Sequence, residues 1–204
     1  MTTKETILNI LNTTLKDREG ITDFVYYLEN GTDFFTAPAS TIFHGNFEGG
    51  LSEHSLNVYN LLKEKNGKFD LKVKEDTIAV CGLLHDICKI NIYTKSKKWD
   101  KDFKNTTGQW REIDCYETNN NLPLGHGEKS VMIIQRFIKL TDEEMIVIRW
   151  HMAGMFEPSI HFQYPNGSAF KKALDMYPLL TLMITSDMEA SGMLDKIIRE
   201  NKIK

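Results

Sequence analysis

The sequence predicts an all-α fold, a compact bundle of about eight or nine helices with one inserted β-hairpin. Along most of the chain, apolar residues recur every three or four positions, which is typical of amphipathic helices. Residues 78–84 and 179–190 are apolar on nearly every side, and this indicates helices that are surrounded by others. Residues 90–123 instead alternate apolar and polar side chains, with a turn sequence at 105–108, so they predict a hairpin at about residues 91–122.

The N-terminal quarter of the chain predicts two helices and a loop. A first amphipathic helix follows Thr2 and Thr3, which can cap it, and ends before Gly20. Residues 23–29 predict a second, short helix. Glycines punctuate residues 30–50, and a loop of this length inside a compact domain is often functional.

The next two helices are predicted at residues 51–67 and 74–89. The second of them contains the apolar run at residues 78–84, and His85 and Asp86 follow that run directly. Burying an imidazole and a carboxylate is unfavourable unless both are paired or bind a metal. This dipeptide is therefore a candidate functional feature.

Helical periodicity returns after the hairpin. One helix is predicted at residues 125–138, and Thr141 and Glu144 form a capping box that opens the next. The remaining elements are a loop at residues 158–167, a helix at residues 179–190 with Pro178 in its first turn, and a last helix at residues 194–199.

Length and composition indicate one domain and exclude two classes of partner. A chain of 204 residues, 41% of them hydrophobic, can bury its own core, so we expect residues 1–204 to form a single domain. No targeting signal or bilayer-spanning apolar run is visible, and we expect a cytoplasmic protein without a membrane partner. A net charge of −3 argues against binding duplex DNA by charge alone. The cysteines, which lack zinc-knuckle spacing, predict reduced thiols: Cys81, Cys88 and Cys115.

Histidine and aspartate residues interrupt five of the predicted helices. A single histidine on a helix is usually a hydrogen-bonded core or surface residue. Five helices that each offer such a side chain instead indicate a site for a divalent metal ion. The candidate ligands are His54, His85, Asp86, His126, His151 and Asp187.

The number of candidate ligands favours two ions over one. His85 and Asp86 point about 100° apart on a helix, so they can straddle one point beyond its end. A single ion leaves two histidines surplus, whereas a second ion bridged to the first by Asp86 uses all six residues. The ligand sets are then His54, His85, Asp86 and Asp187 for the first ion, and Asp86, His126 and His151 for the second.

Five short segments resemble, in their order, the ligand motifs of the HD superfamily of metal-dependent phosphohydrolases: residues 49–56, 83–89, 124–126, 150–151 and 186–187. The resemblance spans residues 44–190 and implies an HD domain with the same two ligand sets. Within the superfamily, the chain most resembles the HD domains of bacterial 3′ to 5′ exoribonuclease-like proteins and of small phage-associated proteins. One departure is Cys88, where the family commonly has glycine.

The resemblance implies an enzyme that hydrolyses a phosphoester with a metal-activated water. The cofactors would be two divalent ions of Mn, Fe, Mg, Ni or Zn, and the substrate a nucleotide or a short single-stranded nucleic acid. Two alternatives stay open, a di-iron oxygenase of the same superfamily and a non-catalytic sensor of a signalling nucleotide. The oligomeric state stays open as well.

Three further features are candidate substrate contacts. Lys89 follows Asp86 by about one helical turn and could contact a bound phosphate, so we expect both to be catalytic; a lysine favoured by the helix dipole is the alternative. His44 lies in the glycine-rich loop and could bind substrate or protonate a leaving oxygen, unless it is merely solvated. Cations alternate with aromatics over residues 93–111, and we expect the hairpin to form one wall of the substrate pocket, although cross-strand pairing also explains the pattern. His161 has no assigned role.

Overall fold

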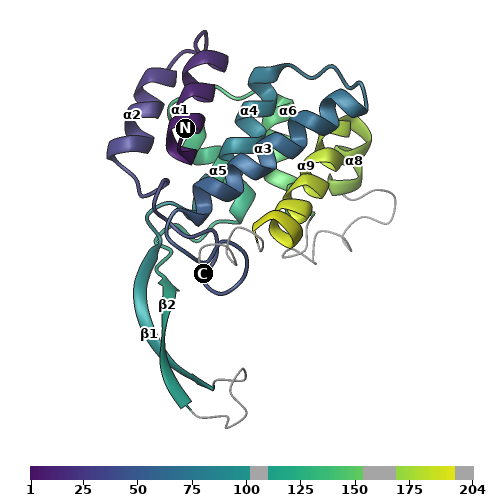
Figure 1. Cartoon of the computed structure of the whole chain (residues 1–204). Helices are drawn as coiled ribbons and strands as arrows, with labels where there is room; N and C mark the ends of the chain where they lie inside the picture. The colour runs from purple at the N-terminus through teal and green to yellow at the C-terminus, as the bar shows by residue number, and fades with distance from the viewer. Residues whose placement is uncertain (102–109, 154–168, 196–204) are drawn as a thin grey trace.

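The computed structural model describes residues 1–101, 110–153 and 169–195. Within these ranges, eight α-helices form a bundle, and one β-hairpin projects from one end of it (Figure 1). The architecture confirms the predicted all-α class with a single inserted hairpin. None of the helices in these ranges is long and apolar enough to cross a membrane.

The elements follow one another along the chain with short connections in most places. They are α1 (Thr3–Thr14), α2 (Ile21–Asn30), α3 (Gly50–Lys68), α4 (Glu75–Leu84), η1 (Ile87–Lys89), β1 (Tyr93–Lys101), β2 (Trp110–Thr118), α5 (His126–Ile134), α6 (Asp142–Trp150), α8 (Ala169–Met176), α9 (Pro178–Glu189) and η2 (Ala190–Leu194).

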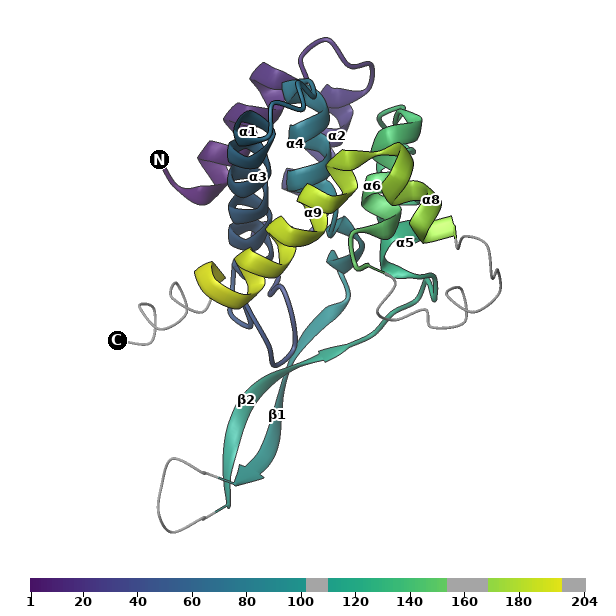
Figure 2. The same ribbon diagram turned by 90° about the vertical axis from the view of Figure 1, so that its right-hand side faces the viewer.

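Helices α3 and α4 form the centre of the bundle. Residues 77–84, the apolar run of α4, are all buried. Helix α3 packs against α1, α4 and α9, and α4 also contacts α6 (Figure 2). The continuous apolar surface of α4 is explained by these neighbours, because a helix with partners on every side exposes no polar face.

Local sequence signals begin two of the helices. Thr2 and Glu5 form a capping box at the start of α1, and Thr141 and Glu144 form the predicted one at the start of α6. In each box the threonine hydroxyl accepts from one backbone amide while the glutamate carboxylate accepts from another. Pro178 lies in the first turn of α9, as predicted.

Two glycines let helices approach more closely than any other residue would allow. A β-carbon on Gly82 in α4 would lie 2.6 Å from the Cα atom of Tyr59 in α3. A β-carbon on Gly127 in α5 would lie 2.3 Å from the carbonyl oxygen of Arg149 in α6. Because carbon atoms normally pack at about 3.5–4 Å, these glycines set the distances between α3 and α4 and between α5 and α6.

Helix α4 is shorter than the sequence predicts. It ends at Leu84 instead of continuing to Lys89, and the 3-10 turn η1 follows. Nδ1 of His85 donates to the carbonyl oxygen of Gly82 at 3.0 Å. In a longer helix that carbonyl would accept from the amide of Asp86, so the imidazole competes with helix continuation.

Other boundaries differ from prediction as well. Helix α8 was not predicted; it is only eight residues long, so its apolar pattern has little length in which to repeat. Helix α3 continues one residue beyond the predicted end at residue 67. The loop predicted at residues 158–167 and most of the helix predicted at residues 194–199 lie outside the described residues.

The hairpin points away from the bundle in both views (Figures 1 and 2). Its strands pair antiparallel, from Tyr93 opposite Thr118 at the base to Lys101 opposite Trp110. At the base, the hydroxyl of Tyr93 donates to the carbonyl oxygen of Ala39 at 3.4 Å. This contact fixes the root of the hairpin against the loop that precedes α3.

Candidate metal centre

Three buried histidines come from three different helices. His54 lies near the start of α3, His85 directly follows α4, and His151 directly follows α6. Each donates through Nδ1, His54 to Asp195 at 2.9 Å and the other two to carbonyl oxygens three residues earlier, at 3.0 and 2.7 Å. Because the Nδ1 atom of each ring is engaged in this way, all three rings turn Nε2 toward the space between them.

The Nε2 atoms of these rings converge with carboxylate oxygens. Nε2 of His54 lies 3.3 Å from Nε2 of His85 and 3.3 Å from Oδ1 of Asp187 in α9. Oδ2 of Asp86 lies 3.6 Å from both of these Nε2 atoms, and Oδ1 of the same carboxylate lies 3.5 Å from Nε2 of His151. The two oxygens of Asp86 therefore face different histidines, as expected of a carboxylate that bridges two ions.

His126, the sixth predicted ligand, opens α5 at the edge of this group. A ring nitrogen of His126, a carboxylate oxygen of Asp86 and the sulfur of Cys88 lie within 4.8 Å of one another. The His126 side chain is exposed, whereas Asp86 and Cys88 are buried. All six predicted ligands therefore lie together, four of them buried, Asp187 partly buried and His126 exposed.

The electrostatics reflect how closely the groups are packed. Burial lowers the pKa of His54, but hydrogen bonds to Asp187 and Asp195 outweigh it and raise that pKa to about 9. Burial lowers the pKa of His85 to about 4. Burial alone would raise the pKa of Asp86, yet the charges of Lys89 and His85 hold it well below its usual range. The site thus keeps its carboxylates ionised, which is the form that binds a metal ion.

The donor set fits a borderline or hard divalent cation. Imidazole nitrogens and carboxylate oxygens are ligands that Zn, Mn, Fe and Mg accept in proteins. Among the described residues, neither Oδ1 of Asp86 nor Nε2 of His151 has a hydrogen-bond partner, although both are buried. A cation between them would provide a partner for both atoms.

Asp195 is a functional candidate that the sequence analysis missed. Its Oδ2 accepts from Nδ1 of His54, and its Oδ1 accepts from the side-chain amide of Asn57 at 3.0 Å. A carboxylate in this position fixes the ring orientation and tautomer of a metal-ligating histidine. Its spacing gave no usable signal, because the π-helix η2 (Ala190–Leu194) separates it from α9 and its partners lie on α3.

A cavity of about 560 Å³ opens beside the ligands. Lys89 and His44 both line it, together with Asp86, His126 and Asp187. The walls also include Ile42, Phe43, Met152, Met188, Ser191 and Gly192. The predicted substrate contacts and the predicted ligands therefore share one opening.

Lys89 and His44 occupy different positions in that opening. Nζ of Lys89 lies 2.6 Å from Oδ2 of Asp86, so the predicted proximity is a direct ion pair. The ring of His44 lies 4.9 Å from the ring of His54, centroid to centroid, and burial together with the charge on His54 lowers the pKa of His44 to about 4. At neutral pH the chain thus offers an ammonium and a neutral imidazole beside the ligands.

The hairpin does not form a wall of the cavity. None of its described residues lines the opening, and the strands extend away from the bundle (Figure 2), so the prediction is wrong for residues 93–101 and 110–118. The reason is its root, where Tyr93 and Lys95 attach to the loop before α3, Lys95 at 3.0 Å from Glu48. His161 lies outside the described residues.

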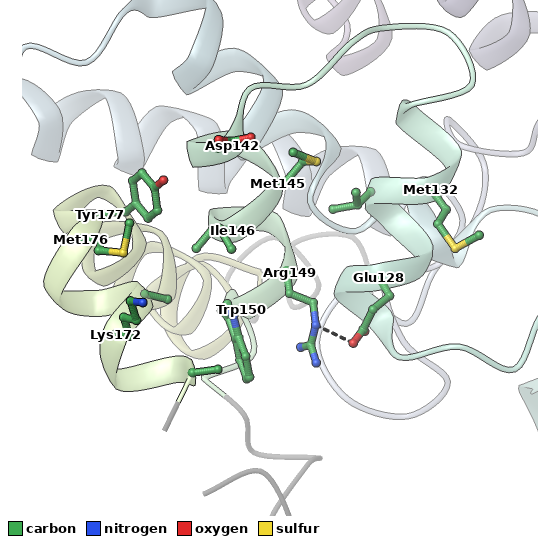
Figure 3. A pocket seen from close by; sticks show the side chains of 13 residues that line it. Glu128, Met132, Asp142, Met145, Ile146, Arg149, Trp150, Lys172, Met176 and Tyr177 are labelled. Atoms are coloured by element: carbon green, nitrogen blue, oxygen red, sulfur yellow. Dashed lines mark ion pairs between the residues drawn. The ribbon is translucent and has the colours of Figure 1, made fainter. Parts of the chain in front are cut away.

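A second cavity, of about 670 Å³, lies between α5, α6 and α8 (Figure 3). Its lining is mainly apolar, with Met132, Met145 and Trp150 among the side chains. Two of its charged groups, Arg149 and Glu128, pair at 2.5 Å. This arrangement resembles no acid–base or metal-ligand group, so we place the candidate site in the other cavity.

Comparison with known proteins identifies the domain. The family model described as the HD domain matches residues 51–183, more than half of the chain. The match includes five of the six predicted ligands, while the sixth, Asp187, lies beyond its end, as does Asp195. Neither the search of curated proteins nor the search of solved structures returned a match.

Proposed function

The chain belongs to the HD domain family, and on that premise we propose that it hydrolyses a phosphoester in a nucleotide or a short single-stranded nucleic acid. HD domains bind divalent metal ions and are typical of metal-dependent phosphohydrolases. The observation that carries the proposal is the convergence of imidazole Nε2 atoms with both oxygens of Asp86, at 3.3–3.6 Å. Imidazole nitrogens and carboxylate oxygens gathered in this way form a donor set that suits a divalent cation.

We assign the ligands to two ions. The first would be held by His54, His85, Asp86 and Asp187, and the second by Asp86, His126 and His151. Two divalent ions at this place would activate water as a nucleophile near neutral pH and neutralise the charge that grows on the phosphoryl oxygens. The protein contributes fixed ligand positions, because Asp195 and two backbone carbonyls hold the three rings through Nδ1.

Lys89 and His44 would bind the phosphate. The ammonium of Lys89 lines the cavity and remains charged, because the Asp86 carboxylate raises its pKa against the effect of burial. A fixed positive charge beside the phosphoryl group stabilises the transition state more than the ground state, since negative charge accumulates there. His44, neutral at cell pH, would orient an oxygen of the substrate through a hydrogen bond.

The cavity favours a small substrate with an apolar part. Its volume of about 560 Å³ lies within the range of pockets that hold small ligands. Ile42, Phe43, Met152 and Met188 supply apolar and sulfur-bearing surface beside the ionisable groups. A nucleotide matches this division, with its phosphate at the ligands and its base against the apolar wall.

The decisive experiment is a substrate screen on protein of known metal content. The purified chain would be treated with a chelator, reloaded with Mn²⁺, and assayed against nucleotides, cyclic dinucleotides, short oligonucleotides and p-nitrophenyl phosphate. We expect metal-dependent release of phosphate or cleavage of a diester with at least one of them. Tight metal binding without hydrolysis would refute the proposal, and oxygen consumption by the iron-loaded protein would then favour the oxygenase chemistry.

A further inference from the structure

Among the potential ligands outside the predicted six, one is a thiol. Cys88 lies in η1, two residues after Asp86, and is 3% exposed. Its Sγ atom lies 3.8 Å from Nδ1 of His126. A carboxylate oxygen of Asp86 completes a group whose ligand atoms all lie within 4.8 Å of one another.

The chain holds this sulfur in place from two directions. The turn η1 places Cys88 beside Asp86, because the amide of Lys89 donates to the Asp86 carbonyl oxygen at 3.0 Å. The backbone amide of Cys88 donates to the hydroxyl of Ser130 in α5 at 3.1 Å, and α5 is the helix that His126 opens. The sulfur and the imidazole are therefore fixed by the same junction between η1 and α5.

We propose that Cys88 binds the second ion as a thiolate, together with Asp86 and His126. This inference rests on the proposed two-ion function. The binding step is balanced without any redox change: the S–H bond breaks, a sulfur–metal bond forms, and the proton leaves to solvent. No oxidant or further reactant is needed.

Geometry and an independent observation support the assignment. Zinc-type bonds of about 2.3 Å to sulfur and about 2.0–2.1 Å to nitrogen place two ligands of one ion roughly 3.5–4 Å apart, which the 3.8 Å between Sγ and Nδ1 matches. Oδ1 of Asp86 and Nε2 of His151, both buried and without a hydrogen-bond partner among the described residues, lie next to this group, 3.5 Å apart.

A thiolate ligand changes which metals the second position selects. Soft sulfur donors favour zinc, iron and cobalt, whereas an all-nitrogen and oxygen set also accepts magnesium and manganese. The two positions of this chain would therefore differ in metal preference, with the softer ion beside Cys88.

Cobalt(II) tests the proposal through a signal that does not depend on activity. The full chain, freed of metal with a chelator, would be titrated with cobalt(II) chloride while its near-ultraviolet and visible absorption is recorded. Sulfur bound to cobalt gives a charge-transfer band in the near ultraviolet that nitrogen and oxygen ligands do not give. We expect this band in the wild-type chain, in the step that fills the second position.

Matched variants identify the sulfur. Cys115→Ser, on the hairpin, is the control and should keep the band at full intensity. Cys88→Ser should lose it and bind the second cobalt ion at least about tenfold more weakly, the lower end of the effect of removing even an outer partner of a ligand. Cys88→Gly tests the same point if the serine variant does not fold.

The failures of the two proposals are distinguishable. Two cobalt ions bound per chain without a charge-transfer band would overturn the role of Cys88 and leave the two-ion function standing. A band that persists in both Cys88 variants would also overturn it. If the wild-type chain binds no cobalt at all, the metal-dependent function itself fails.

Discussion

Two groups of polar side chains lie in this bundle, and they differ in how completely their hydrogen-bond donors and acceptors are paired. The first, which we call the arginine cluster, contains Arg18, Asp76, Thr77, Thr141 and Glu144. The guanidinium of Arg18 donates to Glu144 at 2.5 and 2.9 Å and to Asp76 at 2.8 and 3.2 Å. Glu144 also accepts from the Thr77 hydroxyl and the Thr141 amide, at 2.9 Å each.

The second group, the histidine cluster, contains His54, His85, Asp86, His151 and Asp187. Here imidazole Nε2 atoms face one another and carboxylate oxygens, at 3.3–3.6 Å. Each cluster contains a buried carboxylate, Glu144 in the first and Asp86 in the second, so burial and charge alone do not separate them. The difference teaches that a completed hydrogen-bond network indicates a structural role, whereas an excess of acceptors indicates a place for a cation.

The largest effect is expected at Asp86. Asp86→Ala should reduce hydrolysis of any substrate to the background rate, because the substitution removes a ligand of both ions. Metal analysis and the phosphate-release assay on the same sample would measure it. An Asp86→Ala protein that kept two ions and its activity would contradict the assignment of the histidine cluster as the metal site.

Lys89 tests the comparison further, because its ammonium group is a hydrogen-bond donor beside the histidine cluster. Lys89→Ala should lower kcat by roughly 10²–10³-fold, the range for removing one group that stabilises transition-state charge, and should leave the metal content unchanged. Lys63→Ala is the matched control, since Lys63 pairs with Glu75 on the surface at 2.7 Å. Equal metal loss in Lys89→Ala would show that this lysine supports the ligands instead.

The arginine cluster should respond in the opposite manner. Arg18→Met leaves the buried Glu144 carboxylate without its partner, which should lower the free energy of unfolding by about 3 kcal/mol. Urea unfolding measures this loss, and Lys63→Met, which breaks an exposed pair, should cost below about 1 kcal/mol. Metal content and activity of the folded Arg18→Met protein should equal those of wild type; a lost metal site would mean that the clusters are coupled.

A smaller effect is expected at Asp195, which touches the histidine cluster only through His54. Asp195→Asn keeps the shape and an acceptor oxygen but removes the charge, and it should weaken metal binding by roughly 10–100-fold. Competition with a chromogenic chelator measures the affinity. Asn57→Asp is a second test of the same contact. A carboxylate at position 57 would repel Asp195 and so disturb its hydrogen bond to the His54 ring.

The smallest effect is expected on the pH dependence of Tm in protein that a chelator has freed of metal. Hydrogen bonds to Asp187 and Asp195 raise the pKa of His54 from 6.5 to about 9 against the effect of burial. A raised pKa contributes stability that is fully present below pH 6.5 and is lost as the pH rises through about 9. The Tm of chelator-treated protein should therefore fall across that window, while metal-loaded protein should stay flat, because a bound ion excludes the proton.

Much of the fold and most of the site could be predicted from local patterns. The capping box at Thr141 and the buried run in α4 are short-range signals, and the structure has both. The six candidate ligands stood out because histidines and aspartates interrupt apolar helices, and they do lie together. Their role as ligands stays a prediction until metal is measured.

What could not be predicted depends on contacts between distant segments. Helix α4 ends early because the His85 ring takes a backbone carbonyl, a choice that its position in the site makes favourable. Asp195 matters only because α3 brings His54 and Asn57 to it, 141 and 138 residues away in the chain. The direction of the hairpin follows from its contact with the loop before α3, which no alternation within its strands encodes.

The two glycines at the helix crossings have a consequence for how this site tolerates mutation. Gly82 sits where α3, which carries His54, meets α4, which His85 directly follows, and Gly127 sits where α5 meets α6. Neither residue carries a functional group, yet a single methyl group at either one would push apart the helices that bear facing ligands. Substitution scans read only by activity would count both among the essential residues, although neither touches metal or substrate. Both positions require glycine because a side chain there would overlap the neighbouring helix, whereas the hydrogen atom of glycine does not.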